Sequence, residues 1–293
     1  MNTFDNIQTP TLASSAMLVN FSFNLWGDTR QDKSASQRAA FSNNADASAV
    51  KLTVSLMAGC KELADLKKFT SGARTRLRSM TSPWFDGNMR LLPTKQYHKF
   101  NDVANTIQTE WQDLVDAFVD VYQYEVMAVQ AKLGDLFDSS KYPTVDQMRY
   151  EFGFDLKYMP VPLNNFFSDL EAEHNEILKA QFESTVQDVL NNATADIWNR
   201  LDPALERMST QLTDKDGKKR RIYDSLVGNV EEMIEFMQAC NITNDPEIER
   251  VQSQLAIALR GVTPDKLRNS ESMRVATKEA VDAVIKTLPS LDF

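Results

Sequence analysis

The sequence predicts an α+β fold that is predominantly α-helical. Two long stretches, Phe100–Leu136 and Phe166–Leu201, keep apolar residues at the three-and-four spacing of amphipathic helices. Two short stretches, Met17–Trp26 and Phe152–Pro160, alternate polar and apolar residues as half-buried strands do. We therefore expect an elongated hairpin of two long helices with a small antiparallel sheet, followed by a C-terminal helical segment.

Each predicted strand places large apolar side chains on one face. The two faces consist of Val19, Phe21, Phe23 and Leu25 in the first strand and of Phe152, Phe154, Leu156 and Tyr158 in the second. Because a lone strand is unstable in water, we expect the two strands to pair and to bury these faces under the long helices.

Between the first strand and the first long helix the pattern is less regular. Residues 28–47 are polar and predict a loop or a short helix, whereas residues 49–79 have helical spacing that Gly59 and Gly72 interrupt. Met89–Leu92 predicts a short strand that ends at a proline.

The long helices are followed by recognisable start and stop signals. Thr144 with Gln147 forms a capping-box pattern before a short helix. Asp202 and Pro203 predict a kink or a restart after the second long helix, and residues 213–221 resemble a linker.

Three more helices are predicted in the C-terminal part of the chain. They are Ile222–Cys240, Pro246–Arg260 behind an Asp245 cap, and Pro264–Leu288 behind a Thr263 cap, with Gly261 supplying a left-handed stop. The expected organisation is a flexible arm (1–14), an α+β core (15–213) and a C-terminal helical region (214–293).

Composition restricts the class of protein. The net charge of −9 over 293 residues opposes general binding to nucleic acids or membrane surfaces, which are also anionic. The two cysteines, Cys60 and Cys240, lie in apolar helical patterns and are expected to be buried thiols of a reducing compartment. With no visible targeting signal or membrane-spanning stretch, we expect a cytoplasmic protein that does not bind membranes.

No motif in the sequence predicts catalysis, a cofactor or a metal. The two histidines, His98 and His174, are isolated, and the Glu-x-x-His spacing of di-iron proteins occurs once, at Glu171–His174. The glycines form no phosphate-binding loop. We expect a protein that is not an enzyme and takes no cofactor. The alternative is an enzyme whose catalytic carboxylates cannot be recognised from their spacing in the sequence.

Charge is unevenly distributed along the chain. Basic residues dominate from Lys61 to Lys99 and acidic residues from Asn101 to Ser140. The two regions could pair internally, or the basic one could form an aromatic surface for single-stranded nucleic acid or for a partner. The residues of that possible surface are Arg74, Arg76, Arg78, Trp84, Phe85 and Arg90. A second basic run, at 218–221, is interpreted as a solvated turn.

Several short motifs together resemble a known family. They are Leu18–Trp26 followed by Arg30, Thr81–Trp84, Arg90–Pro93, Lys141–Thr144, Phe152–Phe154 and Pro160–Pro162. This combination resembles a domain-of-unknown-function family of bacteriophage, plasmid and mobile-element proteins, often encoded near MoxR-type AAA+ ATPases and von Willebrand A-domain proteins.

The resemblance implies a non-enzymatic accessory protein in the cytoplasm of a bacterial host cell. Its implied role is a helical protein-interaction module, oligomeric and bound to an AAA+ ATPase or a von Willebrand A-domain partner. The alternative is a single-stranded nucleic-acid-binding protein of phage recombination or replication that uses the basic segment 61–99.

Overall fold

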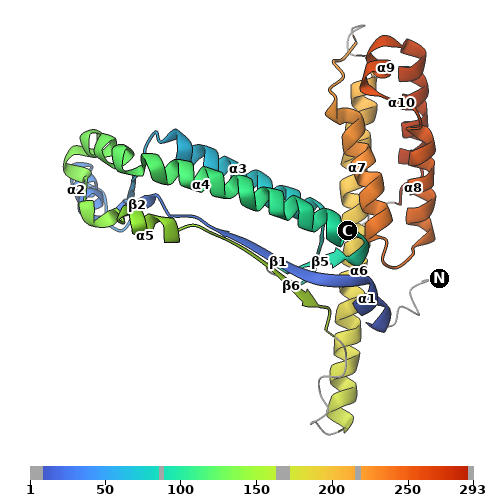
Figure 1. Ribbon diagram of the computed structural model, residues 1–293, viewed down its shortest axis with the longest axis horizontal. Coiled ribbons are helices and arrows are strands. Elements are labelled where there is room, and N and C mark those ends of the chain that lie inside the picture. Colours follow the sequence, from blue (N-terminus) through green and yellow to red (C-terminus); the bar gives the residue numbers. More distant parts are fainter. Residues whose placement is uncertain (1–8, 86–88, 163–171, 215–218, 290–293) are drawn as a thin grey trace. The chain divides into compact units, whose positions relative to one another are not determined.

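The structure, a computed structural model, describes residues 9–85, 89–162, 172–214 and 219–289. It is mostly helical with a small sheet, which confirms the predicted fold class (Figure 1). The chain divides into two compact units. Unit 1 comprises Met1–Val19, Ser79–His98 and Tyr158–Phe293, and unit 2 comprises Asn20–Arg78 and Lys99–Lys157.

Unit 1 contains most of the helices. Its elements are α1 (Thr9–Ser15), β4 (Ser82–Pro83), β5 (Met89–Pro93), η1 (Thr94–Gln96), α6 (Ala172–Leu212), α7 (Ser225–Cys240), α8 (Pro246–Ala258), α9 (Pro264–Asn269) and α10 (Glu271–Ile285). Unit 2 is built around the other long helix. Its elements are β2 (Thr29–Asp32), α2 (Lys33–Ser42), β3 (Leu52–Ser55), α3 (Lys61–Ser79), α4 (Tyr97–Leu133), η2 (Gly134–Leu136), η3 (Ser139–Lys141) and α5 (Val145–Tyr150).

Two strands belong partly to each unit: β1 (Ala16–Asn24) and β6 (Gly153–Pro160). The four-stranded sheet has the order β4-β5-β1-β6, so β1 and β6 are neighbours, as their matching aromatic faces predicted. A second sheet, of β2 and β3, is antiparallel, with Arg30 opposite Val54.

The core of unit 2 is an aromatic cluster between the strands and α4. The ring of Phe23 stacks on Phe154 with centroids 4.5 Å apart and meets Trp111 edge-on at 5.9 Å. Trp111 and Phe118 are buried on the apolar stripe of α4, as the helical spacing predicted. The indole Nε1 of Trp111 donates to Thr70 Oγ1 at 3.0 Å, so this buried donor is satisfied.

Two clusters of buried residues lie among the described residues of unit 1. In one, Leu18 of β1, Trp84 and Leu91 pack with Val186 and Leu190 of α6. In the other, the second half of α6 packs with the C-terminal helices. The α6 helix continues through Pro203 to Leu212, so the predicted restart at 202–203 is wrong.

The reason for this continuity lies beyond the proline. Leu201, Leu205, Met208 and Leu212 are all buried and keep helical spacing, so packing of this stripe outweighs the helix-breaking tendency of Pro203. The predicted start of this helix, at 166–171, lies outside the described residues.

Several predicted boundaries are wrong. Residues 52–55 form β3 instead of helix, and α3 begins only at Lys61, after Gly59 adopts a left-handed φ of 88°. Gly72, predicted as a break, lies within α3. The predicted helix Pro264–Leu288 is two helices, because the side chain of Ser270 accepts from the Met273 N–H and starts α10.

The helix α1 and the division into units bear on the domain limits expected from the sequence. Residues 9–15 form α1, and Leu12 is fully buried, so the arm expected for 1–14 does not extend over this part. The expected boundary at 213/214 falls within unit 1, and the long helices α4 and α6 belong mainly to different units. The hairpin between them stays a prediction.

Candidate functional site

The six residues of the possible basic surface are divided between the units. Arg74, Arg76 and Arg78 belong to unit 2, whereas Trp84, Phe85 and Arg90 belong to unit 1.

Arg74 is engaged with the core strand of unit 2. Its Nη2 donates to the Phe23 carbonyl oxygen at 2.8 Å, and its guanidinium lies 5.6 Å from the centroid of the Phe23 ring. These two contacts hold the end of β1 against α3, and the Phe23 ring occupies one face of the Arg74 guanidinium. Arg76 and Arg78 are exposed on α3.

Trp84 and Phe85 differ in their accessibility. Trp84 is 6% exposed and packs in the cluster with Leu18 and Val186, so its ring is not accessible for stacking on a base. Phe85 is 44% exposed and meets Trp84 edge-on at 4.9 Å. The only aromatic face that this pair offers to solvent is that of Phe85.

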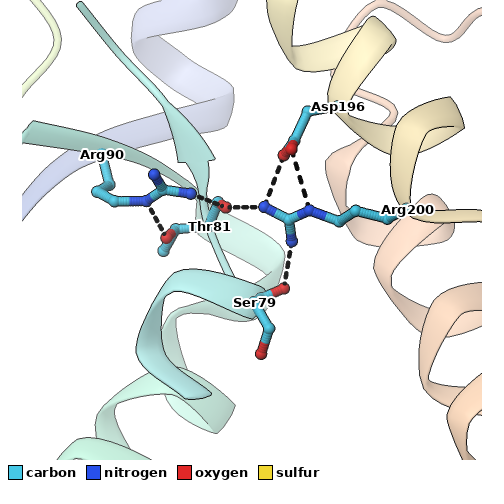
Figure 2. Close-up of polar contacts among 5 residues, drawn as sticks. All are labelled: Ser79, Thr81, Arg90, Asp196 and Arg200. Carbon is cyan, nitrogen blue, oxygen red and sulfur yellow. Dashed lines mark hydrogen bonds and ion pairs between the residues drawn. The ribbon is translucent and has the colours of Figure 1, made fainter. Parts of the chain in front are cut away.

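Arg90 belongs to a polar network in unit 1 (Figure 2). Its Nε donates to Thr81 Oγ1 at 2.7 Å and its Nη2 to the Thr81 carbonyl oxygen at 2.6 Å. The same carbonyl accepts from Arg200 Nη2 at 3.1 Å, and Arg200 Nη1 donates to the Ser79 carbonyl oxygen at 2.8 Å.

Asp196 completes this network. It lies one turn before Arg200 on α6, and the two form a two-pronged ion pair with N–O distances of 3.0 and 2.7 Å. The guanidinium of Arg200 also lies 4.6 Å from the centroid of the Phe236 ring. The network therefore fixes residues 79–81 to α6, which is a structural role for both arginines.

The sequence pattern did not indicate Asp196 or Arg200 as site residues. Their i, i+4 spacing was the one available signal, and that spacing is common on solvated helices. The partners that give them their role are backbone carbonyls more than 100 residues away along the chain.

The two cysteines carry free, buried thiols. Both cysteines are buried, as predicted. Burial raises the pKa of the Cys240 thiol to about 12, against a smaller opposing effect of Arg200. Burial also raises the pKa of Cys60. Because the thiolate is the reactive form, neither cysteine is activated as a nucleophile at neutral pH.

The histidines and carboxylates form no metal centre in the part of the chain that the structure describes. Within it, no three His, Cys, Asp or Glu side chains gather as a metal site would require. His98 is exposed and lies edge-on to Tyr97 at 5.4 Å, and His174 is exposed on α6. Glu171 lies outside the described residues. Among the described helices, none has the length and apolarity needed to cross a membrane.

The exposed face of α4 is a more distinctive surface than the basic segment. Eight exposed residues follow one another along this helix at steps of one, three or four residues: Glu110, Asp113, Ala117, Asp120, Tyr124, Met127, Ala128 and Ala131. At 100° per residue they lie within an arc of about 100°. The first part of this α4 face is acidic, and the second part, from Tyr124 onward, is apolar.

Two side chains dominate the apolar part of the α4 face. Tyr124 is 74% exposed and Met127 is 56% exposed. The opposite stripe of the helix, with Trp111, Phe118 and Tyr122, is buried in the core of unit 2. The helix thus has apolar side chains on two faces, and only one of them is covered.

Known proteins do not provide a match from which the role of this site could be inferred. No family model matches the chain, and neither a curated protein nor a solved structure matches it.

Proposed function

We propose that this chain is a non-enzymatic helical interaction module that binds a protein partner through the α4 face. The observation that carries the proposal is the exposure of Tyr124 and Met127 beside Ala128 and Ala131 on a helix whose other side is already packed. Large exposed apolar side chains grouped on one helix face are typical of surfaces that bind another helix.

The composition of the α4 face suits a helix as its occupant. Ala117, Ala128 and Ala131 leave room for close approach of a second backbone, and Tyr124 and Met127 supply the two large contacts. Tyrosine and methionine are also enriched at protein interfaces.

The acidic part of the α4 face adds a charge requirement. Glu110, Asp113 and Asp120 are exposed there, so a complementary partner carries basic residues opposite them. If two copies of the chain pair through their α4 faces, the acidic parts of the two faces repel each other. The apolar parts can then come together only in an arrangement that keeps the acidic parts apart. An antiparallel pairing over 124–131 does this.

The proposed context follows the family resemblance. The chain is a phage or mobile-element accessory protein of the bacterial cytoplasm that oligomerises and docks to a MoxR-type AAA+ ATPase or a von Willebrand A-domain protein. The α4 face supports binding to a protein; the identity of the partner comes from the resemblance alone.

The nucleic-acid alternative has weaker support. Arg76, Arg78 and Phe85 are accessible, but Arg74, Arg90 and Trp84 are engaged in internal contacts. Stacking and phosphate contacts supply the affinity of single-strand binders, and at least Arg74, Arg90 and Trp84 would have to leave their present contacts to provide them.

The test uses the full chain with Tyr124→Glu and Met127→Glu, separately and together. Each introduces a charge into the apolar part of the α4 face without touching the core. We expect self-association, measured by light scattering after size-exclusion chromatography, and capture of a purified MoxR-type AAA+ ATPase to weaken at least about tenfold.

The matched control is Gln130→Glu. Gln130 is exposed on the same helix but lies outside the α4 face, so the same added charge is expected to change neither readout. Equal loss in Gln130→Glu, or unchanged self-association and capture in the double variant, would show that the face is not an interface. Self-association without capture of the ATPase would remove that partner and keep the oligomer.

A further inference from the structure

A basic cavity lies in the C-terminal part of unit 1. Its volume is about 340 Å³, and it is lined by residues 219–224, which precede α7, together with Arg268 of α9 and Arg274 of α10. The charged side chains among them are Lys219, Arg220, Arg221, Arg268, Arg274 and Asp224. Five of these six side chains are cationic.

Arg274 is the most unusual residue of this cavity because it is only 2% exposed. Its contacts with the described residues are long: Nη2 lies 3.3 Å from Asp214 Oδ1, and Nη1 lies 3.4 Å from the Arg220 carbonyl oxygen. Its Nε is buried without a hydrogen-bond partner. A buried guanidinium is costly unless its donors and its charge are satisfied, so this side chain lacks part of what it requires.

Arg220 has the same deficiency. Its Nε is also buried without a partner, and its guanidinium forms no ion pair with any residue that the structure describes. Arg221 packs against the Tyr223 ring, with its guanidinium 5.3 Å from the ring centroid. Arg220 and Arg274 therefore both line this cavity, and each has a buried Nε–H without a partner.

The remaining cations of the cavity are already paired. Lys219 lies 2.5 Å from Glu271, and Arg268 binds both Asp224 and Asp265. Arg268 Nε also donates to the Ile222 carbonyl oxygen at 3.1 Å, which ties α9 to the segment before α7. These pairs make a fixed wall, and the unused donors belong to Arg220 and Arg274.

We infer that this cavity binds a phosphate group carried by a small molecule. A phosphate offers several acceptor oxygens and a double negative charge, which matches Arg220, whose guanidinium has no ion-pair partner among the described residues, and Arg274, whose contacts with Asp214 and Arg220 are long. The cavity volume falls at the lower end of the range for small-molecule sites, so the ligand is no larger than about a nucleoside monophosphate. The exposed ring of Tyr223 at the cavity provides an apolar surface for the rest of such a ligand.

The first experiment measures binding of inorganic phosphate, AMP and uncharged adenosine by calorimetry, at constant ionic strength with chloride as the competing anion. We expect saturable binding of phosphate and AMP and none of adenosine. Arg220→Gln and Arg274→Gln should each weaken binding by about tenfold or more, because each removes a charge-assisted contact.

The matched control is Lys286→Gln, which removes one exposed positive charge from the same unit and should leave the affinity within about twofold. If Arg274→Gln does not fold, Arg220→Gln decides, since Arg220 is only partly buried. Absence of saturable binding up to about 10 mM, or equal weakening in Lys286→Gln, would overturn the inference. A single-stranded oligonucleotide that binds this cavity more tightly than AMP would also overturn it, in favour of a nucleic-acid backbone.

Discussion

At the scale of single residues, Arg200 shows how one side chain can organise a loop. Its planar guanidinium binds Asp196 with two nitrogens, reaches the carbonyl oxygens of Ser79 and Thr81, and places a face on the Phe236 ring. A lysine has no such fork, so Arg200→Lys cannot reproduce this set of contacts. The two carbonyls have no sequence signature, which explains why only the structure identifies this residue.

At alkaline pH, the stability of the folded chain is expected to depend on Tyr122. Its hydroxyl donates to the Pro143 carbonyl oxygen at 2.9 Å, and burial raises its pKa from 10.0 to about 12, with a smaller effect from Tyr142. Between these two pH values the unfolded chain has lost the proton and the folded chain keeps it. The stabilisation is thus complete below pH 10 and is lost as the pH rises through about 12.

The measurement is the free energy of unfolding in urea, from about pH 9 to pH 12. Tyr122→Phe lowers stability at neutral pH by about 1 kcal/mol, through the lost hydrogen bond, but shows a shallower alkaline decline than the wild type. Tyr124→Phe, which removes an exposed hydroxyl from the same helix, serves as control. An alkaline decline equally steep in wild type and Tyr122→Phe would contradict the assignment.

At the scale of elements, substitution by alanine is expected to change stability in opposite directions at two glycines of unit 2. Gly59 has a φ of 88°, and an added Cβ would lie 3.3 Å from Lys132 Nζ. Gly72 lies within α3, and an added Cβ would meet nothing within 4 Å. Gly59→Ala is expected to destabilise by about 1–2 kcal/mol and Gly72→Ala to stabilise by about 0.5–1 kcal/mol.

Chemical denaturation of the two variants beside the wild type checks this pair, and each serves as the control of the other. Unchanged or raised stability in Gly59→Ala would contradict the importance of the left-handed turn before α3, and lowered stability in Gly72→Ala would contradict the gain expected inside that helix.

Elements with a repeated pattern could be predicted from the sequence. The helix α4 was expected from Phe100 to Leu136 and spans Tyr97–Leu133, and the capping box of Thr144 and Gln147 forms with both of its hydrogen bonds. Sequence periodicity identifies these elements because each is decided by neighbours within one or two turns.

Elements that depend on distant partners could not be predicted. The strands β2 and β3 have four residues each, too few for a clear alternation, and they exist because they pair with each other. The cavity before α7 was interpreted as a solvated turn for a similar reason. Its buried cation, Arg274, lies over 50 residues away from the basic run, on a helix that looks ordinary in sequence.

At the scale of the whole molecule, the negative charge of the chain limits its interaction with nucleic acid. The exposed acids of α4 and the net charge of −9 repel a phosphate backbone. We expect a labelled single strand, followed by fluorescence anisotropy at physiological salt, to bind more weakly than about 10 μM and with a steep salt dependence.

The variant Arg76→Glu tests whether the basic segment contributes at all, because Arg76 is one of its exposed residues. Weak binding that is nearly unchanged in Arg76→Glu is expected. Submicromolar binding that disappears in Arg76→Glu would replace the protein-interaction proposal by the nucleic-acid alternative.

The alternation of the chain between two units has a consequence for its synthesis. Unit 2 ends at Lys157, so a ribosome that has released this residue has supplied every segment of that unit. Unit 1 begins with Met1–Val19 but also needs Tyr158–Phe293, so its first segment must wait, with Leu12 and Leu18 still uncovered, until the first half of α6 emerges. The N-terminal segment is therefore the part of the nascent chain that most needs a chaperone, and stalled chains that end after Lys157 should aggregate through it.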